Sequence, residues 1–303
     1  MKILMTGSTG LLGTALRQEL TRGGHNVCRL VRPGTNIEAL RGSHGFDVKW
    51  DPATGDLEGA GEGADAVVNL AGASIVHGRW TARQKQLLKT SRVDTTRALV
   101  TALSQMALRP RILISASAVG YYGSRGDEVL REDSPAGNDF LSQLSIEWEA
   151  EALKAEVLGI RVVLARFGVV LAKEGGALPT MARPFRLGVG GRIGSGQQWM
   201  SWVTLRDVVA ILRMALDNGA PRGPINVVSP QPVRNAEFTS LLASALHRPA
   251  LFPAPAFALR LMLGEMADAL LLSSQRAEPA QLAKLQYAFH DPDLATALRS
   301  TLC

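Results

Sequence analysis

Thr6-Gly-Ser-Thr-Gly-Leu-Leu-Gly13, close to the start of the chain, is the stretch that decides the fold. It follows the apolar run of residues 2–6 and opens a segment, residues 12–20, whose apolar side chains recur on one helical face. Three glycines at G-x-x-G-x-x-G spacing allow a sharp turn off a strand, close approach of backbone to a pyrophosphate, and tight packing of helix on sheet. A simple tight turn is the alternative. The strand before the turn and the helix after it favour nucleotide binding by Gly7, Ser8, Thr9, Gly10, Leu11, Leu12 and Gly13, with the phosphates facing the N–H groups of the helix.

The sequence around this turn alternates strand and helix patterns. Four further apolar runs predict strands at residues 27–31, 66–70, 111–115 and 160–165. Helical stretches lie between them, at residues 84–103 and 142–158. Near-continuous apolar strands are typical of a parallel sheet covered on both faces, so we expect an α/β protein with a Rossmann-type, doubly wound sheet.

The pattern changes after about residue 170, where glycine and proline become frequent and the tail becomes largely helical. We therefore predict a Rossmann domain over residues 1–245 and a small, mostly helical C-terminal domain over residues 246–303, which contributes to the substrate side. Thr204 is expected to cap a helix through a capping box with Asp207, and Asn235 is expected to cap the next helix.

The second predicted strand is followed by arginine and not by an acidic residue. An NAD site usually places Asp or Glu about 20 residues after the glycines, where the carboxylate holds the ribose hydroxyls. This chain has Arg32 at that distance, with Arg29 close by. A carboxylate would repel a 2′-phosphate, whereas a guanidinium can bind it through two hydrogen bonds. The sequence thus predicts NADP(H) as the cofactor, unless Arg32 is only a solvated side chain at a strand end.

Composition narrows the classes of partner. The 303 residues carry a formal net charge of +6, which reflects either ordinary solubility or attraction to anionic ligands. Because no dense Lys/Arg block with interleaved aromatics occurs, we expect a small-molecule substrate and no nucleic acid. The two cysteines exclude a disulfide framework, and the five histidines, His77 among them, lack metal-ligand spacing, so no metal is expected.

The same features predict a location in the cytoplasm. The chain runs straight into a strand, so no signal peptide is expected. The longest apolar stretch, residues 251–272, is broken by Arg260, Glu265 and Asp268, which predicts a helix packed against a core and no membrane partner. Homodimer formation is left open.

Several stretches together resemble an extended short-chain dehydrogenase/reductase, specifically the sugar-nucleotide epimerase family with a small C-terminal domain of unknown function. The resemblance spans essentially the whole chain. It is carried by residues 6–13, Asn69-Leu-Ala-Gly72, Arg79-Trp80, Ser91-Arg92, Ser115-Ala-Ser-Ala-Val-Gly-Tyr-Tyr-Gly123, Pro184-Phe-Arg-Leu-Gly188, Gly194-Ser-Gly196 and the tail from Arg248 to Met266.

This resemblance implies further contacts. Leu70, Ala71 and Gly72 are expected to line the cofactor, and Arg92 stands where relatives usually carry Asn, so that it would contact cofactor phosphate or ribose. An exposed helix position is the alternative for Arg92. Ser115 and Ser117 occupy the end of the fifth strand; Ser117 matches the catalytic serine, whose hydroxyl would bond a substrate carbonyl or alcohol.

One departure from the family is pronounced. Such enzymes need Tyr-x-x-x-Lys about 20 to 25 residues after the serine, where Lys lowers the pKa of the tyrosine. Here Phe140 and Leu144 stand at or near those positions, and neither can transfer a proton. Tyr121 or Tyr122 in the preceding loop would have to substitute, or else form only a wall of the site. Two functions therefore stay open: an NADP-dependent oxidoreductase or epimerase acting on a polar alcohol, such as a nucleotide sugar, and an NADP(H)-binding sensor or scaffold without turnover.

Overall fold

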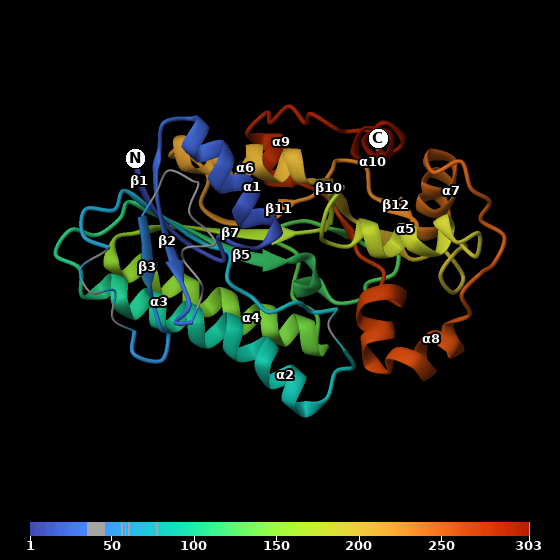
Figure 1. The fold of residues 1–303 in the computed structure, drawn as a ribbon, viewed down its shortest axis with the longest axis horizontal. Coiled ribbons are helices and arrows are strands. Elements are labelled where there is room, and N and C mark those ends of the chain that lie inside the picture. Colours follow the sequence, from blue (N-terminus) through green and yellow to red (C-terminus); the bar gives the residue numbers. More distant parts are fainter. Residues whose placement is uncertain (35–45, 56, 58, 60, 77, 303) are drawn as a thin grey trace.

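The computed structural model describes residues 1–34, 46–55, 57, 59, 61–76 and 78–302. His77 lies outside these residues. A seven-stranded, all-parallel sheet forms the centre of the molecule (Figure 1), with strand order β11-β7-β5-β4-β1-β2-β3. Its strands are β1 (Lys2–Thr6), β2 (Asn26–Val31), β3 (Phe46–Lys49), β4 (Ala66–Asn69), β5 (Ile112–Ala118), β7 (Arg161–Phe167) and β11 (Gly223–Val227). This order confirms the doubly wound, Rossmann-type sheet predicted from the sequence.

The order of the strands reverses beside β1. β2 and β3 extend the sheet on one side of β1, and β4, β5, β7 and β11 extend it on the other. Because all strands are parallel, the carboxyl ends of β1 and β4 open a crevice at this switch point, where ligands bind in folds of this type. The register pairs Thr6 with Asn69, so the two strands end side by side.

Helices cover both faces of the sheet (Figure 1). α1 (Leu11–Arg22), α6 (Leu205–Asp217) and α9 (Ala280–Lys284) lie on one face, and α2 (Ala82–Lys89), α3 (Thr95–Ser104) and α4 (Phe140–Leu153) lie on the other. A π-helical turn, η2 (Thr90–Asp94), joins α2 to α3, and η4 (Lys154–Leu158) follows α4. Alternate residues of β1 point to opposite cores: Ile3 packs in the cluster that contains Leu16 of α1, and Leu4 in the cluster that contains Leu99 of α3.

The C-terminal half adds short elements beyond the carboxyl edge of the sheet. Three two-stranded pairs are β8 (Val169–Leu171) with β10 (Trp202–Thr204), β9 (Trp199–Met200) with β12 (Val233–Arg234), and β6 (Val129–Leu130) with β13 (Arg276–Ala277). A separate apolar cluster joins α5 (Leu178–Arg186), α7 (Asn235–Ala245) and α10 (Leu294–Leu302). The remaining elements are η3 (Val119–Tyr122), α8 (Ala256–Leu263) and η5 (Ala267–Leu272).

Two expectations about the C-terminal half concern helix caps. Thr204 caps α6 as predicted, because its side chain accepts a hydrogen bond from the Asp207 N–H, whereas the Asp207 carboxylate accepts from the Tyr287 hydroxyl and the His290 N–H. The Asn235 cap is wrong. Asn235 is the first residue of α7 itself, and its side-chain oxygen accepts from the Ile193 N–H at 2.8 Å. A loop distant in sequence thus binds the side chain that the local pattern predicted as a helix cap.

The apolar stretch of residues 251–272 also differs from expectation. α8 buries none of its residues, and Phe257, Leu261 and Met262 are exposed, so it is not a helix packed into a core. The short helix begins after Pro255 and ends at Gly264 in the left-handed region, which leaves too few turns to bury a full face. None of the helices in the described part of the chain combines the length and apolarity that a bilayer crossing requires.

Candidate functional site

The glycine-rich turn brings the backbone of β1, α1 and β4 into close packing. Gly7 adopts φ +64°, and a Cβ on it would lie 2.9 Å from the Ala71 nitrogen. A Cβ on Gly13 would lie 2.7 Å from Ser8 Cα. Neither position can therefore carry a side chain without moving backbone. The packing holds the turn directly against the residues that follow β4.

The turn also presents unused hydrogen-bonding groups. α1 starts at Gly10 without a side-chain cap, so its first-turn N–H groups are free for an anion. Ser8 is buried, and its hydroxyl has no hydrogen-bond partner in the described part of the chain. Thr9 and Gly10 are exposed, and Leu11 and Leu12 are half-buried. A Cβ on Gly176 would lie 2.9 Å from Leu11 Cδ2, so the glycine loop after β8 reaches over the turn.

The segment that follows β4 at the switch point consists of Leu70, Ala71 and Gly72. It is anchored by the buried side-chain amide of Asn69, the last residue of β4. Asn69 accepts a hydrogen bond from Thr6 Oγ1 at 2.7 Å and donates to Thr96 Oγ1 at 2.8 Å and to Ser115 Oγ at 3.2 Å. Ser115 is fully buried in this network. The structure thus gives Ser115 a role in joining adjacent strand ends, and a direct contact with cofactor stays only a prediction.

Ser91 and Arg92, on the π-helical turn η2, bind the backbone of Ala73, the next residue of this segment. Ser91 Oγ accepts from the Ala73 N–H at 3.0 Å, and Arg92 Nη2 donates to the Ala73 carbonyl at 2.9 Å. The Arg92 guanidinium packs beneath Gly72 and lies 5.3 Å from the Trp148 ring. Burial lowers the pKa of Arg92 to about 10, which leaves it cationic at neutral pH. No carboxylate pairs with it among the described residues.

The arginines after the turn occupy different environments. Arg32 is exposed just beyond the end of β2, whereas Arg29 is buried and forms an ion pair with Asp47 of β3. Arg17 of α1, which sequence reasoning missed, lies near this pair, and its buried Nε has no partner in the described ranges. Burial and the charge of Arg29 lower the pKa of Arg17. Arg32 is therefore the arginine here whose guanidinium faces solvent.

Ser117 lies in a buried ionic network at the end of β5. Its hydroxyl donates to Glu149 at 2.5 Å, and Glu149 forms a two-pronged ion pair with Arg166 of β7 at 2.8 Å. Ser117 is 2% exposed. The predicted contact of Ser117 with a substrate would require this bond to break. Sequence reasoning missed both charged partners, although charged residues within apolar segments signal a buried pair.

Two tyrosines follow this network. Tyr122 is buried; it donates to Asn226 Oδ1 at 2.7 Å and accepts from Arg166 at 3.0 Å. Burial raises the pKa of Tyr122 to about 12, against the lowering effect of Arg166. Tyr121 is only half-buried, and its ring centroid lies 3.6 Å from the Arg166 guanidinium carbon. Tyr121 is thus the phenol of this pair that is partly exposed.

Apolar side chains occupy the positions where the family carries tyrosine and lysine. Leu144 is buried, and Phe140 packs edge-to-face on Trp80 with ring centroids 5.3 Å apart. Lys85 Nζ lies 4.8 Å from the Phe140 ring and 2.5 Å from Glu265. The ammonium group over the Phe140 ring therefore comes from α2 and is paired with the C-terminal segment.

Other features lie apart from this crevice. A cavity of about 730 Å³ lies between α1 and α6, lined by residues such as Arg22, Val209 and Arg213, and none of the predicted site residues borders it. Across the residues that the structure describes, no group of three or more His, Cys, Asp or Glu side chains is placed to hold a metal ion.

Comparison with known proteins gives one consistent result. Residues 3–228 match the family described as "NAD dependent epimerase/dehydratase family", and residues 254–301 match "Domain of unknown function (DUF1731)". The chain is 41% identical to the Epimerase family protein ML0860 of Mycobacterium leprae over 98% of this chain and 94% of the relative. It is 40% identical to the Epimerase family protein YfhF of Bacillus subtilis over 98% of this chain and 97% of that protein.

A solved structure agrees with these relatives. The crystal structure of human epimerase family protein SDR39U1 (isoform2) with NADPH matches with a TM-score of 0.87 and 33% identity, over 100% of this chain and 99% of that one. The sequence relatives and the solved structure both match this chain over nearly its full length. The chain belongs to the NAD-dependent epimerase/dehydratase family.

Proposed function

We propose that this chain binds NADP(H) at the carboxyl edge of its sheet. The observation that carries the proposal is the Gly7–Gly13 turn, which cannot accept side chains at Gly7 or Gly13 and leaves α1 uncapped above an unpartnered Ser8 hydroxyl. These groups suit a pyrophosphate, which accepts several hydrogen bonds and favours a helix N-terminus. The human relative solved with NADPH supports the choice of cofactor.

The other predicted residues take distinct parts in this proposal. Arg32 binds the 2′-phosphate of the adenosine, because its guanidinium is exposed while Arg29 is paired with Asp47. Leu70, Ala71 and Gly72 line the adenosine side. Arg92 acts chiefly by holding Ala73 in place, and its unpaired charge favours the anionic cofactor.

The reaction we propose is oxidation of a polar alcohol to its carbonyl compound, the reverse reduction of that carbonyl, or epimerisation at the alcohol carbon, as in a nucleotide sugar, in a reducing cytoplasm. The bound cofactor would accept or return a hydride. Tyr121 is the residue proposed to move the proton, because Tyr122 is buried with its hydroxyl engaged and Phe140 has no titratable group. Arg166, stacked on the Tyr121 ring, fixes its orientation.

A second function, a sensor or scaffold that binds NADP(H) without turnover, is favoured by a specific observation. Phe140 and Leu144 replace the acid/base pair, and Ser117 is held by Glu149. Three steady-state assays separate the two: oxidation of NADPH by ketones, reduction of NADP+ by alcohols, and chromatographic detection of epimerised nucleotide sugar with NADP+ present, because epimerisation consumes no net cofactor. Turnover that is lost in Tyr121→Phe supports an enzyme; complete absence of turnover with retained NADPH affinity supports the sensor.

Calorimetric titration of the purified chain with NADPH and NADH tests cofactor binding itself. NADPH should bind more tightly. Arg32→Glu should weaken the binding of NADPH by about 1.5–3 kcal/mol, the range for a lost charged hydrogen bond, and leave the affinity for NADH nearly unchanged. Arg222→Glu, an exposed arginine after α6, is the matched control. Equal affinities of the wild type for both cofactors would remove Arg32 from the proposal, and no response to either at millimolar concentration would overturn it.

A further inference from the structure

Two segments far apart in sequence meet at the C-terminal side of the molecule. The Phe252 N–H donates to the Gly190 carbonyl at 3.1 Å, and the Ala254 N–H donates to the Arg192 carbonyl at 2.9 Å. The chain after α5 therefore lies beside the chain that leads into α8. We call their exposed side chains the basic apolar surface: Arg186, Leu187, Val189, Arg192, Arg248, Leu251, Phe252, Phe257, Leu261 and Met262.

The apolar part of this surface is unusually concentrated. Of the thirteen large hydrophobic side chains that are exposed in the described part of the chain, seven belong to it. Phe257 is 74% exposed and Leu261 is 78% exposed, one helical turn apart on α8. α8 buries no residue, so these side chains contribute little to the fold. Concentrations of this kind mark sites of contact with a partner or a membrane.

The charge of the surface has one sign. The sequence contains no Asp or Glu between Glu174 and Asp207, and none between Glu237 and Glu265. Arg186, Arg192 and Arg248 are exposed, and none of them has an ion-pair partner within the described ranges. Arg260 of α8 is neutralised by Asp268 at 2.9 Å. Unpaired cations thus belong to the same two adjoining segments as the exposed apolar side chains.

We propose that the basic apolar surface docks onto an anionic lipid bilayer. Apolar side chains of α8 and of the adjoining loops would enter the boundary between headgroups and acyl chains, while the arginines bind lipid phosphates. A second copy of the chain fits poorly, because a two-fold contact would bring the same arginines against one another, and the carboxylates beside α8, Glu265 and Asp268, are already paired with Lys85 and Arg260. The expectation of no membrane partner came from the lack of a spanning segment, and docking on a surface needs none.

The segment that carries the surface also contacts α2 and the loop that precedes it. Arg79 Nη2 donates to the Leu261 carbonyl at 3.4 Å, and Lys85 of α2 pairs with Glu265 just beyond α8. Docking through α8 would therefore bring α2 and this loop close to the lipid surface. The proposal stands on the exposed side chains alone and is independent of whether the chain binds NADP(H).

Vesicle flotation tests the proposal with the full-length chain. Vesicles of phosphatidylcholine mixed with phosphatidylglycerol should carry the wild-type protein upward, and pure phosphatidylcholine vesicles should carry several-fold less. High salt should weaken the binding, because the arginine contribution is screened. The double variant Phe257→Ser/Leu261→Ser and the double variant Arg186→Glu/Arg192→Glu should each lose about fivefold or more of the bound fraction, since each removes one of the two attractions.

Matched controls carry the same substitutions elsewhere. Val157 is 90% exposed and Leu108 is 67% exposed, so Val157→Ser/Leu108→Ser removes comparable apolar area from another face. It should float like the wild type, and all variants should keep the wild-type thermal midpoint. No flotation of the wild type would overturn the proposal, as would wild-type flotation of Phe257→Ser/Leu261→Ser. Self-association in sedimentation velocity that disappears in that variant would assign the surface to a second copy instead.

Discussion

At the scale of single residues, the two ends of the glycine motif have separable roles. A Cβ at Gly13 meets Ser8 Cα at 2.7 Å, whereas a Cβ at Gly10 meets nothing nearer than the Gly7 carbonyl oxygen at 3.4 Å. Gly13→Ala should therefore cost about 2–4 kcal/mol in urea unfolding, because backbone must move. Gly10→Ala should lower the free energy of unfolding by about 0.5 kcal/mol or less. It should nevertheless weaken the binding of NADPH at least about tenfold, because the added methyl group meets the pyrophosphate. Equal unfolding midpoints for the two variants would contradict the close packing at Gly13.

Tyr122 makes the stability of the protein sensitive to alkaline pH. Burial raises the pKa of Tyr122 to about 12, above the value of about 10 for an unfolded chain. The neutral phenol therefore stabilises the fold fully below about pH 10, and this contribution of about 2–3 kcal/mol is lost as the pH rises through 12. Burial also raises the pKa of Tyr287, whose hydroxyl donates to Asp207, so the two losses add.

Urea unfolding at a series of pH values from about 8 to 11.5 checks this prediction. Tyr122→Phe should be less stable at the neutral end, because the Asn226 and Arg166 hydrogen bonds are gone. It should also lose less stability than the wild type on going to high pH. Parallel pH profiles for the wild type and Tyr122→Phe would show that the buried phenol does not titrate as described.

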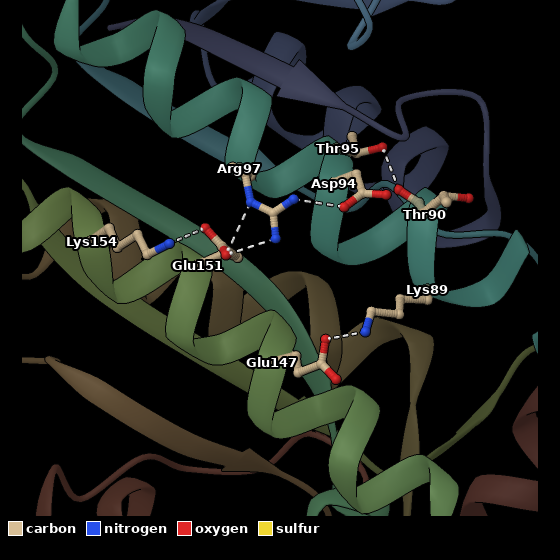
Figure 2. A network of polar contacts seen from close by, with 8 residues as sticks. All are labelled: Lys89, Thr90, Asp94, Thr95, Arg97, Glu147, Glu151 and Lys154. Atoms are coloured by element: carbon tan, nitrogen blue, oxygen red, sulfur yellow. Dashed lines mark hydrogen bonds and ion pairs between the residues drawn. The ribbon is translucent and has the colours of Figure 1, made fainter. Parts of the chain in front are cut away.

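At the scale of elements, charged side chains join α2 and α3 to α4. Figure 2 shows two neighbouring contacts of this kind. Glu147 pairs with Lys89 at 2.7 Å, with both side chains 43% exposed. Glu151 is 10% exposed and accepts from Arg97 at 3.0 Å and from Lys154 at 2.7 Å. Burial raises the pKa of Glu151, but the hydrogen bonds from Lys154 and Arg97 lower it by a larger amount. The pKa of Glu151 therefore lies below its ordinary value.

These two carboxylates should differ in their contribution to stability. Glu147→Gln should change the free energy of unfolding by no more than about 0.5 kcal/mol, as is usual for an exposed pair. Glu151→Gln should cost about 1–2 kcal/mol, because it removes the largely buried negative charge that Arg97 and Lys154 share; Arg97 then keeps only Asp94 as a charged partner. Chemical denaturation at low and high salt measures both. A larger cost for Glu147→Gln than for Glu151→Gln would contradict the arrangement in Figure 2.

At the scale of the whole molecule, the proposed boundary at residue 245 does not separate two packing units. β13 pairs with β6, and Leu282, from the C-terminal segment, lies in the same cluster as Ile3 and Leu16. Leu298 of α10 packs with Phe238 of α7. A chain ending at residue 245 should therefore lack cooperative unfolding and expose apolar surface to a hydrophobic dye. A cooperative transition near the wild-type midpoint would establish residues 1–245 as an independent domain.

The sequence by itself determined the parts that depend on neighbouring residues. The turn from residue 6 to residue 13, the buried parallel strands and the Thr204 cap are set by local backbone conformation and by the period of apolar side chains, which can be read along the chain. The replacement of Tyr-x-x-x-Lys by Phe140 and Leu144 was also visible in the sequence, because it is a matter of residue type.

Only the tertiary structure decided how the polar side chains are used. Ser117 bonds to Glu149, which lies 32 positions further along the chain; Arg29 pairs with Asp47 on the next strand; and Asn235 binds a loop instead of its own helix. Exposure of the α8 face likewise depends on which segments pack over it. Such contacts depend on where distant segments meet, and a hydroxyl, guanidinium or amide binds whichever partner burial brings within reach.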